Sequence, residues 1–268
     1  MPLAPIAEDS VVTRIRSIAV EAWLPVLLVG LWWFVSSSSS SFYFPPLREI
    51  MTRFADLWFS DQFAVHVVPS LRNFGIGFLL GVTIGILCGL ALGSMPQTHR
   101  ALSPTLEFIR ATPVIALVPL TIVLLGTDVV QKVAIIAFAC MWPTLLNTVD
   151  GVRAVDPLVR DVARSYRLGR WDSSMRVFLR SATPQIIAGM RTSVAVAVVA
   201  MVGSELFASS EGIGYFVLQS QRTYAMTDMW AGLIMLGLLG YGLNLLFALL
   251  ERRTLRWHRL RLETTAAQ

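Results

Sequence analysis

The fold of this chain follows from residues 150–184, whose sequence is DGVRAVDPLVRDVARSYRLGRWDSSMRVFLRSATP. This polar stretch lies between two long apolar segments. Its pattern predicts a helix over about residues 158–168, a break at Gly169, and a second helix over about residues 172–181, closed by Pro184. We name this helix pair the elbow. Its positive charge indicates the cytoplasmic side of a membrane, and the arginines that supply it are Arg153, Arg160, Arg164, Arg167, Arg170, Arg176, Arg180 and Arg191.

The composition indicates an integral membrane protein. The 268 residues are 55% hydrophobic and 15% charged, with a mean hydropathy of +0.64. These values leave too few polar groups to cover a soluble surface. Because a span needs about 20 mostly apolar residues, we predict one all-α polytopic membrane domain with six transmembrane helices. Their approximate ranges are 18–36, 67–93, 102–125, 130–148, 187–208 and 229–250.

Basic residues near the predicted span ends set the orientation. Arg14 and Arg16, then His99 and Arg100, the elbow, and the arginines of the tail all fall on one side, so we expect both termini in the cytoplasm. The formal charge of +5 then reflects topology and contact with anionic lipid, and not nucleic-acid binding. The predicted segments are 1–17, a cytoplasmic N-terminus; 18–64, the first span, a serine linker and a periplasmic interfacial helix; 65–250, the membrane core, with the elbow at 150–186; and 251–268, a cytoplasmic tail.

The sequence contains no pattern typical of a metal, haem or dinucleotide site. Cys88 and Cys140 lie inside predicted spans without a partner pattern, and we interpret both as packing residues. No Gly-x-x-x-x-Gly-Lys-Ser/Thr loop is present. If the activity consumes ATP, the nucleotide must therefore bind to a partner.

Glycine recurs at every fourth position of the second predicted span. This spacing places the glycines on one helix face, where a neighbouring backbone can approach closely. We expect this face to be a packing surface, and Gly85→Leu to prevent assembly. The glycines are Gly77, Gly81, Gly85, Gly89 and Gly93.

The elbow resembles the EAA loop of ABC importer permeases, whose pattern is Glu-Ala-Ala, three residues, Gly, nine residues, then Ile-x-Leu-Pro. Here Asp161-Val162-Ala163 stands for Glu-Ala-Ala, Arg167 for the glycine, Val177 for the isoleucine, and Leu179-Arg180 for Leu-Pro. Arg167 lacks the freedom of glycine to adopt a left-handed turn, and we expect Gly169 to take that role.

Further stretches are similar to permeases of taurine, alkanesulfonate and nitrate importers, in the same order along the chain. They are Phe44-Pro45-Pro46, residues 110–120, residues 146–157, and residues 212–215. The resemblance covers roughly residues 44–258. It implies a type I, MetI-like core of five helices with an additional peripheral helix at the N-terminus.

The resemblance implies a permease subunit of an ATP-driven importer in the cell inner membrane, without enzymatic activity of its own. The expected partners are an ATP-binding subunit, two per complex, a second permease, a substrate-binding protein, and membrane lipids. ATP and Mg would bind to the ATPase. The expected solute is a small anion such as a sulfonate, taurine or nitrate, or alternatively a pyrimidine-type thiamin precursor. Whether the second permease is another copy or a different chain stays open.

The resemblance also implies site residues. The turn that contacts the ATPase would comprise Asp161, Val162, Ala163, Arg164, Ser165, Tyr166, Arg167, Leu168 and Gly169. The solute route would include Thr112, Pro113, Asn147, Met201, Ser204 and Glu205. Asn147 has an alternative role as a hydrogen-bonding residue between helices.

Glu205 is the carboxylate that hydropathy places within a span. A buried ionisable group in a membrane suggests function, but backbone amides of residues 212–214 would also explain it, as a brace for that loop. A secondary transporter is the rival class, since it needs such a carboxylate for ion coupling. We see no inverted repeat, and no His, Asp or Ser constellation suggests a membrane enzyme.

Overall fold

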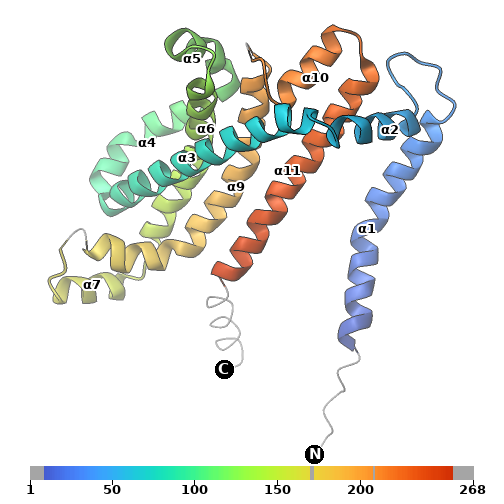
Figure 1. Ribbon diagram of the computed structural model, residues 1–268. Helices are drawn as coiled ribbons and strands as arrows, with labels where there is room; N and C mark the ends of the chain where they lie inside the picture. Colours follow the sequence, from blue (N-terminus) through green and yellow to red (C-terminus); the bar gives the residue numbers. More distant parts are fainter. Residues whose placement is uncertain (1–8, 170–171, 208, 256–268) are drawn as a thin grey trace, which may run out of the picture.

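The structure is a computed structural model. It describes the backbone of residues 9–169, 172–207 and 209–255, and the side chains of these residues from 23 onward except residue 164. Every regular element in these ranges is helical (Figure 1). The elements are α1 Asp9–Ser36, α2 Leu47–Trp58, η1 Phe63–Val67, α3 Val68–Ser94, α4 Pro96–Ala111, η2 Val114–Leu117, α5 Val118–Leu125, α6 Val129–Arg153, α7 Pro157–Ser165, η3 Ser173–Phe178, α9 Leu179–Glu205, α10 Ile213–Arg222 and α11 Met226–Thr254.

Four of the six predicted spans are confirmed as helices long and apolar enough to cross a membrane. Over the described residues these are Phe63–Ser94, Val129–Arg153, Ser173–Glu205 and Met226–Thr254. The third predicted span is a broken pair, Pro96–Ala111 and Val114–Leu125, bent by 82°. The first is helical, but its described apolar part, Trp23–Ser36, is shorter than a span, so the count of six stays a prediction.

The bend in the third span has a local cause. Thr112 is extended, with φ −70° and ψ 125°, because the ring of the following Pro113 disfavours the helical region for the residue before it. Pro119 lies in the first turn of α5, where a missing N–H costs no hydrogen bond. The chain therefore turns at Pro113 and resumes a helix before Pro119.

The glycine face of α3 packs against α6, as predicted. An ideal Cβ at Gly85 would lie 2.8 Å from the carbonyl oxygen of Met141, and one at Gly89 would lie 2.8 Å from that of Leu145. The two backbones are therefore too close for any side chain between them. Such close approach maximises dispersion where lipid removes the hydrophobic drive between helices.

The prediction that Pro184 closes the second elbow helix is wrong. The helix starts at the elbow as the π-helix η3, continues as α9 and passes through Pro184 to Glu205. In a membrane helix, a local π adjustment can accommodate a proline whose N–H is missing. The second elbow helix and the fifth span are thus one continuous helix.

The helix α2 has an apolar stripe along one face. Ile50, Leu57 and Trp58 are buried, and the indole Nε1 of Trp58 donates a hydrogen bond to the carbonyl of Ala231 in α11 at 3.3 Å. The stripe thus packs against protein. The position of α2 at a membrane interface stays a prediction.

The arrangement has two distinct ends. The helix α7, the first turn of α1 and the last turn of α11 lie toward the lower side of Figure 1, which we name the elbow end. The helices α2, α5 and α10 lie at the upper side, the far end. The helix α1 stands apart from the others along most of its length, as expected for a peripheral helix. Residues 1–8 and 256–268, which include Arg256, Arg259 and Arg261 of the predicted tail, are outside the described residues, whereas Arg252 and Arg253 lie in the last turn of α11.

Candidate functional site

The start of α7 is set by an Asp-Pro pair. The side chain of Asp156 accepts a hydrogen bond from the backbone N–H of Leu158 at 2.8 Å, which caps an N–H that the first turn of a helix leaves unpaired. Pro157 is the first helical residue, where its fixed φ suits the helix. The predicted first elbow helix is confirmed, but it begins one residue before and ends three residues before the predicted range of 158–168.

The end of α7 contains a left-handed arginine. Arg167 has φ +50°, and the N–H of Leu168 donates to the carbonyl of Ala163 at 3.2 Å. This six-residue closure is a Schellman motif, whose left-handed position is usually glycine. The expectation that Gly169 takes this role is wrong, because the hydrogen bond requires the turn one residue before Leu168. Arg167 therefore adopts the backbone that glycine has in the EAA pattern.

The two faces of α7 differ. Three apolar side chains at successive turns are exposed, Leu158 at 69%, Val162 at 48% and Tyr166 at 78%. Ala163 instead is 5% exposed and faces the inside of the chain. The other predicted contact residues with described side chains, Asp161, Ser165, Arg167, Leu168 and Gly169, are all exposed. The side chain of Arg164, and the neighbouring Arg170, are outside the described set.

Arg160 fastens α7 to two spans, a role that the sequence analysis missed. Its guanidinium donates hydrogen bonds to the backbone carbonyls of Val152 and Val155, at the end of α6. The same group lies over the ring of Phe178 in η3, 5.3 Å from its centroid, a cation–π distance. A signal was present, since Arg160 lies on the opposite helix face from Leu158 and Val162. Arg160 therefore links α7 to both the end of α6 and η3.

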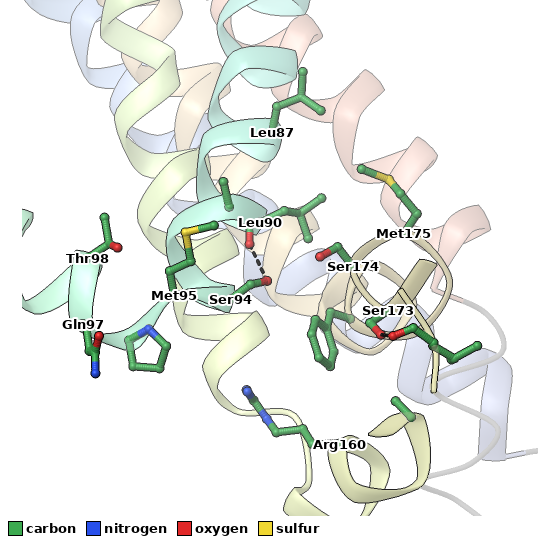
Figure 2. A pocket seen from close by; sticks show the side chains of 15 residues that line it. Leu87, Leu90, Ser94, Met95, Gln97, Thr98, Arg160, Ser173, Ser174 and Met175 are labelled. Carbon is green, nitrogen blue, oxygen red and sulfur yellow. Dashed lines mark hydrogen bonds between the residues drawn. The ribbon is translucent and has the colours of Figure 1, made fainter. Parts of the chain in front are cut away.

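A cavity of about 870 Å³ lies between the elbow and the adjacent ends of α3 and α4 (Figure 2). Its walls come from the end of α3, the start of α4, α7 and η3, and they are mostly apolar. Leu90 and Met95 lie on the α3 side, and Arg160 and Met175 on the elbow side. Met175 also packs against the buried cluster that contains Leu90, so the elbow is in direct contact with the end of α3.

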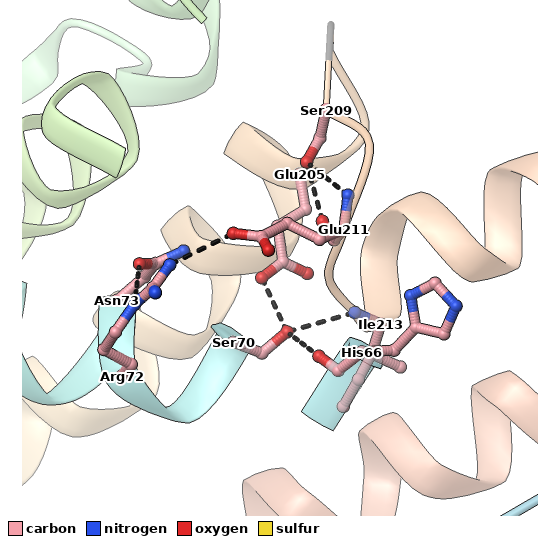
Figure 3. Close-up of polar contacts among 8 residues, drawn as sticks. All are labelled: His66, Ser70, Arg72, Asn73, Glu205, Ser209, Glu211 and Ile213. Carbon is pink, nitrogen blue, oxygen red and sulfur yellow. Dashed lines mark hydrogen bonds and ion pairs between the residues drawn. The ribbon is translucent and has the colours of Figure 1, made fainter. Parts of the chain in front are cut away.

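At the far end, Glu205 braces the loop before α10 (Figure 3). Its carboxylate accepts a hydrogen bond from the Ser70 hydroxyl at 2.6 Å and from the Gly214 N–H at 2.8 Å. The Ser70 oxygen in turn accepts the N–H of Ile213 at 3.0 Å. Glu205 is 1% exposed. These contacts are the ones expected if Glu205 braces the loop before α10.

Two ion pairs join further segments at this end. Arg72 of α3 contacts Glu211 at 3.0 Å, and Arg53 of α2 binds both carboxylate oxygens of Asp228. The hydrogen bond from Arg53 to Asp228 raises the pKa of the Arg53 guanidinium above its ordinary value. The loop before α10 and the start of α11 are therefore tied to α3 and α2.

The predicted route residues do not form one cluster. Thr112 and Pro113 lie at the break of the third span. Asn147 donates to the Pro143 carbonyl at 2.8 Å and accepts from Gln185 of α9 at 3.1 Å, so it joins two helices. Met201 and Ser204 are fully buried. Over the described residues, no group of three or more metal-ligating side chains exists.

The chain matches a known family and several of its members. Residues 81–256 match the family of the binding-protein-dependent transport system inner membrane component. A permease named for aliphatic sulfonates transport in Bacillus subtilis is 30% identical over 236 residues, which are 87% of this chain and 86% of that protein. The taurine transport system permease protein of Escherichia coli is 26% identical over 251 residues, 91% of each.

Another relative and a solved structure agree. A bicarbonate transport system permease protein of Synechococcus elongatus is 30% identical over 192 residues, 71% of this chain and 69% of that protein. Among solved structures, the MetNI methionine ABC transporter has a chain with a TM-score of 0.62 at 16% identity, over 70% of this chain and 94% of that one. This likeness confirms the MetI-like fold. The chain therefore belongs to the family of binding-protein-dependent transport system inner membrane components and is a permease subunit of an ABC importer, for which a separate subunit hydrolyses ATP.

Proposed function

We propose that this subunit forms the route for a small anion, such as a sulfonate, taurine or nitrate, and that α7 couples the route to an ATPase. The observation that carries the coupling is the exposed apolar row of Leu158, Val162 and Tyr166 beside the inward anchor Arg160. An amphipathic helix of this kind fits a groove in a partner protein. Without a partner that covers them, apolar side chains exposed to water at the end of a membrane subunit would be unfavourable.

The transmission follows from continuity of the backbone. The far side of α7 leads through Arg160 to the end of α6 and to η3, and η3 continues into α9 without a break. A displacement of α7 by a closing ATPase pair would therefore tilt α6 and α9 as rigid bodies. Among the predicted contact residues, the exposed ones suit direct docking, whereas the buried Ala163 supports the elbow from within.

The proposed assembly contains two ATP-binding subunits, which bind the ATP and Mg, and a second permease, either another copy or a different chain. The elbow end faces the cytoplasm, and with it both termini, because the ends of α1 and α11 lie on the side of α7 (Figure 1). A substrate-binding protein delivers the solute at the far end. Ser210 in the loop before α10 and Arg222 at the end of that helix are exposed there for such a contact.

The choice of an anion rests on the relatives, whose names refer to sulfonates, taurine, nitrate and bicarbonate. A pyrimidine-type thiamin precursor is the alternative solute. Ion-coupled secondary transport is the alternative class, and it would use the Glu205 carboxylate for coupling. The hydrogen bonds of Glu205 to Ser70 and Gly214 favour a brace.

The test is co-purification of the tagged permease with its ATPase, followed by measurement of ATP hydrolysis. We expect Val162→Asp with Tyr166→Asp to release the ATPase, because both place a charge in an apolar contact. Thr254→Asp is the control, an exposed residue at the elbow end of α11, and should retain it. Binding of the ATPase by the double variant at the wild-type level would contradict coupling through α7. Absence of any ATPase in the wild-type preparation would contradict the proposed assembly.

A further inference from the structure

Lys132 is the only lysine of the chain, in which all other basic side chains except histidine are arginine. It lies in α6, one turn from the far end, and is 4% exposed. Among the described residues it has no hydrogen-bond or ion-pair partner. A buried cation inside a membrane span is costly and indicates function.

The register between α3 and α6 places Asn73 opposite Lys132. The glycine contacts advance by one turn on both helices together, and one further turn toward the far end brings these two residues to the same level. The contacts that define the register are Gly77 with Ile136, Gly81 with Cys140, Gly85 with Thr144, Gly89 with Thr148 and Gly93 with Val152.

Asn73 presents an unused donor at this level. Its side chain is 1% exposed, and its amide Nδ2 has no hydrogen-bond partner. Its Oδ1 accepts a hydrogen bond from Arg72 at 3.4 Å (Figure 3). An unpaired buried amide N–H destabilises a protein unless a ligand or another group pairs with it.

The helix α9 covers the same level from the other side. Thr144 of α6 lies 2.9 Å from Ser193 of α9, and because these helices run in opposite directions, their register brings Ser204 and Glu205 to Lys132. The charge of Lys132 acts on the Glu205 carboxylate. No ion pair joins that carboxylate to Lys132, and its oxygens accept hydrogen bonds from Ser70 and Gly214.

We propose that Lys132 and Asn73 form a binding site for a small oxyanion at the far end of the α3–α6 interface. The inference rests on the proposed function and assigns the substrate class to named residues. A cationic donor beside an amide donor, both without acceptors, complements a sulfonate, nitrate or bicarbonate, which carries several acceptor oxygens. Glu205 keeps the site close to neutral, so an anion that enters can also leave. Both donors are buried in the structure, so the far ends of α3, α6 and α9 part when the anion enters.

The test relies on Lys132 being the only lysine of the chain. Reductive methylation of the purified full-length permease modifies only the α-amine and Lys132, and mass spectrometry reports each rate separately. We expect nitrate or methanesulfonate to slow methylation of Lys132 several-fold relative to gluconate at equal ionic strength, and to leave the α-amine rate unchanged. Asn73→Leu should abolish this protection. Asn244→Leu, an exposed asparagine of α11 that bonds only within its own helix, should retain it.

Equal methylation rates of Lys132 in all three salts would overturn the inference. The inference would also be overturned if the α-amine were methylated and Lys132 were not, because small neutral formaldehyde reaches any site that an aqueous anion enters. In the complete importer, Lys132→Met should raise the KM for uptake of the anion about tenfold, the factor for one lost charge-assisted hydrogen bond, and Lys132→Arg should restore part of it. Normal uptake by Lys132→Met, with the ATPase still bound, would contradict this binding site but not the proposed function. Failure of the wild-type permease to bind the ATPase would contradict the proposed function.

Discussion

The carboxylate of Glu205 occupies the space that a side chain at Gly212 would need. An ideal Cβ at Gly212 would lie 2.7 Å from either carboxylate oxygen, and this glycine has φ +108°. The position of the Glu205 carboxylate at the end of α9 therefore requires glycine in the turn into α10, and this glycine leaves the space that the carboxylate fills. The end of α9 and the loop at the far end are consequently one structural unit.

Gly212→Ala should destabilise the far end. Alanine is strained at this φ and also displaces the Glu205 carboxylate, so we expect a loss of more than about 1 kcal/mol in stability, measured as a lower melting temperature of the purified permease. Gly237→Ala in α11, where a Cβ meets no atom within 4 Å, is the control and should not lower it. An unchanged melting temperature for Gly212→Ala would show that the turn can relax away from Glu205.

Ser70→Ala should weaken the same brace through a lost hydroxyl. The change leaves the buried N–H of Ile213 without its acceptor and the Glu205 carboxylate without one donor, which costs about 1–3 kcal/mol. Thr83→Ala on the same helix removes a hydroxyl that is exposed and bonds only to Leu79. Thermal unfolding of the two variants should differ clearly, and equal midpoints would argue against the brace.

Gly85→Leu should prevent α3 from packing on α6. A leucine side chain cannot enter a contact in which even a Cβ would lie 2.8 Å from the Met141 carbonyl oxygen, and the overpacking costs about 1–3 kcal/mol or more. The measurement is the amount of monodisperse permease recovered from membranes. Gly75→Leu, on the same helix with no atom near its Cβ, should be recovered like wild type. A similar loss for both variants would mean that leucine in α3 is harmful wherever it lies.

Arg167→Gly should stabilise the elbow. Glycine has no penalty in the left-handed conformation, so the change should favour the closed turn by about 1 kcal/mol and slow hydrogen exchange of the Leu168 N–H about fivefold. Gly169→Ala, at a residue without positive φ, should leave that rate within about twofold. Faster exchange in Arg167→Gly would indicate that the arginine side chain, and not the turn, holds the motif together.

Local patterns in the sequence accounted for the parts of the fold that depend on neighbouring residues. Apolar runs marked the four confirmed spans, and the four-residue glycine period marked the packing face of α3, because helical geometry places such residues on one side. Pro113 marked the break in the third span for an equally local reason, since a proline restricts the residue before it.

Contacts between distant residues required the folded chain. Pro184 and Arg167 each contradict a local rule because of the structure around them. A π-helix precedes Pro184, and the Leu168–Ala163 hydrogen bond holds Arg167 in the left-handed region. The inward turn of Arg160 toward Phe178 and the shared level of Asn73 and Lys132 depend on which helices pack together and in which register. A helical pattern determines which face a residue lies on, and only packing determines what that face meets.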